Sequence, residues 1–205
     1  MTSEAANTRL EVSKEALKTI YYVVVGISIT EALSRTFLQD GRFLGLNLFD
    51  LLQLPAMLLL LTFLVTSSRF VHGASIHLAD IHAGGGKALL DFCGFFLQAT
   101  LFYVMSLSVR DSLAFLVSFV VLLLGDALWV SVLCLLGYVP FRDTTVRQWV
   151  YSDLAIFLVL VALVYFDPGL RLHSVIIVAV VSSLGAVADY AMNWSFYFPR
   201  EAVTK

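Results

Sequence analysis

Charged residues are scarce in this sequence, and neither cysteine nor basic residues are in excess. Only 14% of the 205 residues are charged, whereas soluble domains carry roughly a quarter. Two cysteines are too few for a disulfide-stapled secreted fold. Thirteen basic residues against 15 acidic ones leave no footprint for nucleic acid. The sequence also has no Walker motif, zinc-protease box or nucleophile elbow.

Apolar residues are abundant instead. They make up 60% of the sequence, and the mean hydropathy is +0.89. A chain this short has too little interior to hide so much apolar surface from water. The composition therefore predicts an integral membrane protein whose first partner is the lipid bilayer.

Six apolar windows approach the ~20 residues that a helix needs to cross a bilayer: 16–33, 48–65, 88–109, 113–139, 149–166 and 174–198. The windows are continuously apolar, whereas β-barrel strands would alternate. We therefore predict an all-α polytopic membrane protein with six transmembrane helices in one bundle. Its single domain covers 15–199, between a polar N-terminal segment at 1–14 and a short tail at 200–205, and its longest loop is cytoplasmic and covers 66–87.

Basic residues are distributed unequally between the two sides of this arrangement. The side with both termini carries nine of them and the opposite side four. The positive-inside rule then places both termini in the cytoplasm. We expect the protein in a cytoplasmic membrane, namely a bacterial inner membrane.

Two carboxylates lie deep inside predicted helices. Asp126 is at the centre of its window without a basic residue within a helical turn, where an ionised acid costs roughly 2.5–3.5 kcal/mol. Asp189 lies slightly past the middle of the last window. It shares one helical face with small and polar residues spaced four, three and four apart, namely Ser182, Ala186 and Asn193. We expect this face and both acids to point inward.

These acids support three interpretations. Hydrogen-bonded carboxyl groups hold helices together in the first, and line a path for cations or protons in the second. A bound ligand or partner subunit compensates them in the third. The path would consist of Asp126, Asp189, Asn193 and Ser182, with Glu31 near its outer mouth.

Other acids have a simpler explanation. Glu31 precedes Arg35 by four residues, the favourable order for an ion pair on one helical face. Asp50, Asp91 and Asp153 lie near predicted helix N-termini, where the macrodipole favours a carboxylate. We expect these three to be structural.

The 66–87 loop contains three of the four histidines. Its polar residues are candidates for a gate or for a contact with a cytosolic protein: Arg69, His72, His77, Asp80 and His82. An amphipathic extension along the membrane surface is the alternative. Only His77 and Asp80 have the spacing of two metal ligands on one helical face, so we expect no metal site and no cofactor.

We expect a small oligomeric channel or transporter for cations or protons, because one six-helix protomer lines only a narrow passage. The first alternative is a non-transporting sensor, anchor or effector subunit that acts through a cytosolic partner at 66–87. A metal-dependent membrane enzyme using the loop histidines is the second.

Overall fold

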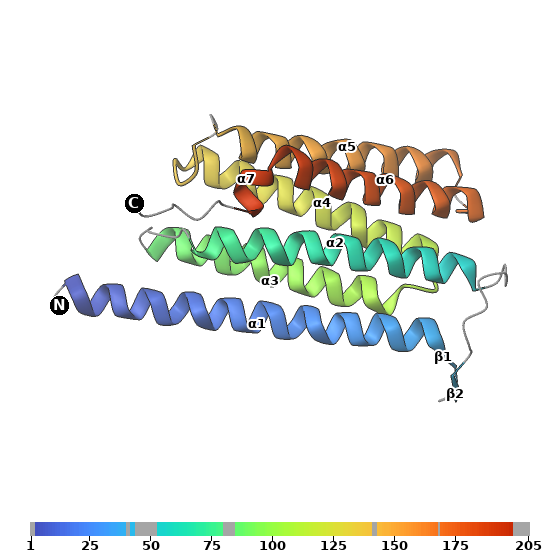
Figure 1. The fold of residues 1–205 in the computed structure, drawn as a ribbon, viewed down its shortest axis with the longest axis horizontal. Coiled ribbons are helices and arrows are strands. Elements are labelled where there is room, and N and C mark those ends of the chain that lie inside the picture. The colour runs from blue at the N-terminus through green and yellow to red at the C-terminus, as the bar shows by residue number, and fades with distance from the viewer. Residues whose placement is uncertain are drawn as a thin grey trace.

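The computed structural model describes residues 3–39, 42–43, 53–79, 85–140, 143–167 and 169–198. These residues form helices apart from two short antiparallel strands (Figure 1). The elements in chain order are α1 (Ser3–Phe37), β1 (Leu38–Gln39), β2 (Arg42–Phe43), α2 (Leu54–Ala79), α3 (Gly85–Leu107), α4 (Ser112–Leu135), α5 (Thr144–Phe166), α6 (Leu172–Met192) and α7 (Trp194–Tyr197).

Six of the described helices are long and apolar enough to cross a membrane. At 1.5 Å per residue, each is about 30 Å long or more, which matches the hydrocarbon thickness of a bilayer. Large apolar side chains cover their outward faces, among them Leu128, Leu158 and Leu184. The prediction of an all-helical chain with six such helices is confirmed for the described residues.

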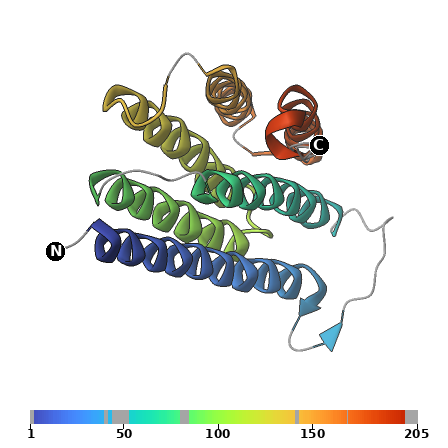
Figure 2. The same ribbon diagram turned by 60° about the vertical axis from the view of Figure 1, so that its left-hand side comes forward.

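The six long helices form a ring in which each packs against the next in the order α1, α3, α4, α5, α6, α2 and back to α1. Helix α2 also contacts α3, α4 and α7, so it is the most central helix of the bundle (Figure 2). The start of α1, the end of α4 and the start of α5 lie at one end of the bundle (Figure 1). We call this the terminal end, and the end with β1 and β2 the hairpin end.

Helix α2 is longer than predicted. The apolar window stops at residue 65, but the helix continues to Ala79, so the predicted 66–87 loop is wrong for 66–79. Arg69 and Leu78 on this extension are buried, which also excludes a surface helix there. The reason is tertiary: the charge of Arg69 is compensated by acids on other helices. Asp80 and His82 lie outside the described residues.

Other helix boundaries also differ from the predicted windows: α1 is helical from Ser3 rather than 16, α3 begins at Gly85 rather than 88, and α4 ends at Leu135 rather than 139. Helix α5 begins at Thr144 rather than 149, because the Asp143 carboxylate caps it by accepting the N–H of Thr145 at 2.8 Å. Helix α6 ends at Met192. Asn193 interrupts the helix before the single turn of α7. Asp50 lies outside the described residues.

The hairpin-end half of the bundle has a tightly packed apolar core. Five large side chains on four helices are almost completely buried there: Phe63, Phe102, Phe119, Leu122 and Leu160. Phe63 and Phe102 meet edge to face with ring centroids 6.0 Å apart. The polar residues described below lie on the other side of this core, toward the terminal end.

Asp167 organises the start of α6. Its Oδ2 accepts the Ser174 hydroxyl at 2.6 Å and the Arg171 N–H at 2.9 Å. These hydrogen bonds, that from Ser174 foremost, lower the pKa of Asp167 from its usual value. The carboxylate therefore stabilises the fold above the unfolded-state pKa of about 3.9, and this contribution disappears as pH falls through the lower folded-state pKa.

We expect Asp167→Asn to lower the melting temperature at about pH 7, and to lower it less at about pH 3. Thermal unfolding of the purified protein at both pH values measures the difference. An equal loss at both would show that the charge of Asp167 contributes nothing to stability.

Candidate functional site

Arg69 is the centre of a buried polar cluster in the terminal-end half of the bundle. Its side chain is 3% exposed. The Nη1 donates to Oδ1 of Asp153 on α5 at 2.6 Å, and the Nε donates to Oδ2 of Asp189 on α6 at 2.8 Å. One guanidinium thus connects three helices. We call Arg69, Asp153, Asp189 and the adjacent Asp126 the Arg69 cluster.

Asp189 has hydrogen-bond donors on both oxygens. Besides Arg69, Asn193 Nδ2 donates to its Oδ1 at 2.7 Å and the Tyr197 hydroxyl donates to its Oδ2 at 2.6 Å. Burial, followed by this hydrogen bond, raises the pKa of Tyr197 well above its usual value, so its hydroxyl keeps its proton. The interruption of the helix at Asn193 brings Tyr197 of α7 into contact with Asp189. Both carboxylate oxygens of Asp189 are therefore satisfied by hydrogen bonds.

Asp126 on α4 is less completely satisfied. Gln98 Nε2 on α3 donates to its Oδ1, and the hydroxyl of Tyr21 donates to Gln98 at 3.4 Å. Asp126 is 1% exposed and lies close enough to interact with Asp153 and Trp149. The Oδ2 atoms of Asp126 and Asp153, however, have no hydrogen-bond partner within the described part of the chain.

A cavity of about 90 Å³ adjoins the Arg69 cluster on its terminal-end side. Six aromatic residues from α2, α3, α4, α5 and α7 line it, namely Phe70, His77, Phe95, Trp129, Trp149 and Phe196. We call it the aromatic cavity. It extends from Asp143 at the α4–α5 connection to Gln98, which donates to Asp126. A single water needs roughly 10–15 Å³, so the cavity has room for several waters or a small organic molecule.

Two glycines allow the tryptophans of this cavity to lie against neighbouring helices. A Cβ at Gly73 on α2 would overlap the Trp149 ring, and a Cβ at Gly94 on α3 would lie 2.7 Å from Trp129 Nε1. The missing side chain of each glycine therefore leaves room for a tryptophan of a neighbouring helix. Packing against Gly73 and Gly94 therefore helps to fix the positions of both rings.

The candidate gate residues lie in different surroundings. Arg69 and His77 lie inside the bundle, and His77 Nε2 is 3.2 Å from Oδ1 of the buried Asp91. His72 instead contacts the ring of Tyr197, with centroids 4.9 Å apart. Arg69 is wrong as a cytosolic contact because it is buried. No group of three His, Cys, Asp or Glu side chains converges on one point among the residues that the structure describes.

The predicted inward stripe on α6 is confirmed. Ser182, Ala186, Asp189 and Asn193 are all buried, as their shared helical face requires. Asn193 and Asp189 are hydrogen-bonded to each other. Ser182 contributes a buried hydroxyl whose oxygen has no hydrogen-bond partner among the described residues.

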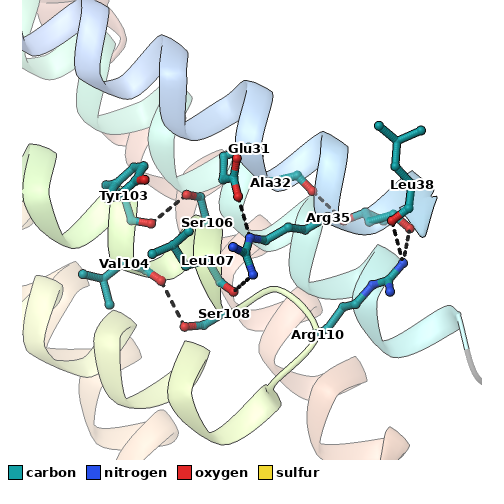
Figure 3. Close-up of polar contacts among 11 residues, drawn as sticks. Glu31, Ala32, Arg35, Leu38, Tyr103, Val104, Ser106, Leu107, Ser108 and Arg110 are labelled. Carbon is teal, nitrogen blue, oxygen red and sulfur yellow. Dashed lines mark hydrogen bonds and ion pairs between the residues drawn. The ribbon is translucent and has the colours of Figure 1, made fainter. Parts of the chain in front are cut away.

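Glu31 is not part of the Arg69 cluster, and its place near the outer mouth of a path stays a prediction. It lies near the hairpin end of α1, where its Oε1 accepts Arg35 Nε at 2.6 Å and its side chain is 34% exposed. Arg35 also donates to the carbonyl of Leu107 at the end of α3, while Arg110 reaches the carbonyl of Leu38 at 3.4 Å (Figure 3). The ion pair between Glu31 and Arg35 is the one that their spacing predicted, and Arg35 connects it to the end of α3.

Sequence reasoning missed the roles of Arg69 and Asp153. Asp153 was expected near a helix N-terminus, but it lies nine residues beyond the first residue of α5, too far for that explanation. The N-cap signal of Asp143 before two threonines could have revealed the earlier start. Likewise, residues 66–72 contain no glycine or proline. The sequence therefore has no helix-ending signal directly after the apolar window that stops at residue 65.

The Arg69 cluster and the aromatic cavity adjoin each other, and their residues come from helices α2 to α7. Comparisons of the chain with known protein families, with curated proteins and with solved structures find no match.

Proposed function

We propose that this chain is an integral membrane transporter that carries protons or small cations past the carboxyl groups of Asp126 and Asp153. The bilayer assignment rests on the six long apolar helices and their apolar outward faces. Following the positive-inside rule, both termini and the aromatic cavity face the cytoplasm.

The observation that carries this proposal is the charge balance of the Arg69 cluster. Three carboxyl groups share one guanidinium, which leaves two negative charges in excess if all are ionised. The excess falls on Asp126 and Asp153, because Asp189 has donors on both oxygens. Uncompensated charge is expensive inside a membrane. A proton or a cation at the free oxygens of Asp126 and Asp153 removes this cost, and its exchange is the first step of transport.

The aromatic cavity adjoins the Arg69 cluster on one side, which favours a transporter over an open channel. The aromatic cavity reaches from the terminal end to Gln98. Toward the hairpin end, the packed side chains of Phe63, Phe102 and Phe119 close the interior. A bound cation would cross only after these helices rearrange, as in alternating access.

The path lies within one chain, so transport at this site does not need a second subunit. Oligomerisation stays a prediction, as does a cytosolic partner. The alternative of a partner-binding subunit is weaker, because Arg69 and Leu78, which were assigned to the contact loop, are buried in α2.

Liposomes that contain the purified protein and an internal pH-sensitive dye test the proposal. After a pH step, with valinomycin and potassium to prevent a build-up of charge, we expect protons to enter faster than in protein-free liposomes. Glu31→Gln is the matched control, because Glu31 lies outside the Arg69 cluster, and its flux should equal that of the wild type. Wild-type liposomes no more permeable to protons, Na⁺ and K⁺ than empty ones would contradict the proposal.

A further inference from the structure

The aromatic cavity has the features of a cage for an organic cation. The rings of Phe95 and Trp129 are 5.1 Å apart at 63°, and those of His77 and Trp129 are 5.3 Å apart at 70°. Across the cavity, Phe70 and Trp149 meet at 90° with centroids 6.4 Å apart. Rings at such steep angles to one another can form the walls of a cavity, whereas parallel stacked rings would fill it. Electron-rich ring faces around a space attract a cation that has weak hydration.

The charges around the cavity favour the same kind of ligand. Asp143 is a lining residue, and Asp126 accepts a hydrogen bond from the lining residue Gln98. No lysine or arginine is among the described residues that line the cavity. Arg69 lies nearby, 5.6 Å from the centre of the Trp149 ring, but its charge is matched by Asp153 and Asp189. The local excess of charge is therefore negative.

Two rings of the cavity already make cation–π contacts with Arg69. Its guanidinium lies over the rings of both Phe70 and Trp149, at 5.7 and 5.6 Å from their centroids. Both distances are within the ~6 Å that defines a cation–π contact. Two cavity rings thus already bind a delocalised cation.

We propose that the aromatic cavity binds a small organic cation with an alkylated ammonium group. The rings of Phe95, Trp129 and Trp149 surround the alkyl groups, and the carboxylates of Asp143 and Asp126 balance the charge. This inference rests on the proposed function, because it names the substrate class of that transporter. The binding step itself, however, is measured without any transport.

Intrinsic tryptophan fluorescence of the full-length protein in detergent tests the inference. The chain has three tryptophans, and Trp194 is 61% exposed outside the cavity. Trp194→Phe therefore leaves only the two cavity tryptophans as reporters. Choline is the probe, and 3,3-dimethyl-1-butanol is its uncharged analogue of the same shape. We expect a saturable change with choline, and binding of the uncharged analogue at least about tenfold weaker.

A ring substitution on α3 supplies a second measurement. Phe95→Leu removes a cavity ring, whereas Phe96→Leu on the same helix removes a ring that is 59% exposed and does not line the cavity. We expect choline affinity to fall about three- to tenfold in the first variant and to stay unchanged in the second.

Two results would overturn the inference: no saturable change with choline, or equal affinity for choline and its uncharged analogue. The second would identify a purely apolar cavity. Proton flux without choline binding would overturn this inference and leave the proposed function in place. Choline binding without any flux would overturn the proposed function and leave the cation site.

Discussion

Replacing Arg69 with methionine is expected to lower the free energy of unfolding by about 3–5 kcal/mol. Methionine fills a similar volume but provides no donor, so Asp153 and Asp189 would each keep a buried charge without the guanidinium. Leaving such charges unpaired costs more than the ion pairs contribute in the native protein. Equilibrium unfolding of the purified protein in mixed detergent micelles measures the loss.

Two further variants separate charge from packing. The triple variant Arg69→Met, Asp153→Asn, Asp189→Asn should regain most of the stability, because it removes the whole ion-pair network. Arg35→Met breaks the half-exposed pair with Glu31 and should cost less than about 1 kcal/mol. A loss in Arg69→Met no larger than that in Arg35→Met would show that the cluster does not hold α2, α5 and α6 together.

Replacing Asp126 with asparagine is expected to reduce proton flux in liposomes by about tenfold or more. An amide does not take up and release a proton near neutral pH, so transfer through this position stops. The fold should persist, because the asparagine carbonyl still accepts the hydrogen bond from Gln98. Dye-monitored flux gives the rate, and circular dichroism with size-exclusion chromatography confirms the fold.

Asp126→Glu is the companion variant. It keeps a titratable carboxyl group but displaces it by one methylene, so we expect partial rather than complete loss of flux. Wild-type flux in a folded Asp126→Asn protein would contradict the role of this residue. The carboxyl group would then only join α4 to α3 through Gln98.

Several features of the fold follow from local sequence patterns. The apolar windows predicted six long helices, because length and continuous hydropathy are properties of a segment by itself. The spacing of Ser182, Ala186, Asp189 and Asn193 predicted the buried stripe on α6 for the same reason, since helical periodicity is local. The ion pair of Glu31 with Arg35 also required only i, i+4 geometry.

The errors concern residues whose environment depends on other helices. Arg69 was assigned to a loop, since a charge marks the end of an apolar helix unless a partner compensates it. The partners are 84 and 120 residues away in sequence, so no local pattern could reveal them. Asp153 was explained by a helix dipole for the same reason.

Composition and helical periodicity by themselves determined that this chain forms six long apolar helices with acids on their inward faces, because both depend on neighbours within a few residues. Only the tertiary structure decided which charges meet and where a cavity remains. It brings Arg69 between Asp153 and Asp189, leaves an oxygen of Asp126 without a partner among the described residues, and assembles the aromatic cavity from α2, α3, α4, α5 and α7. Pairing and packing across helices depend on how their faces fit together, and hydropathy along the chain does not encode that fit.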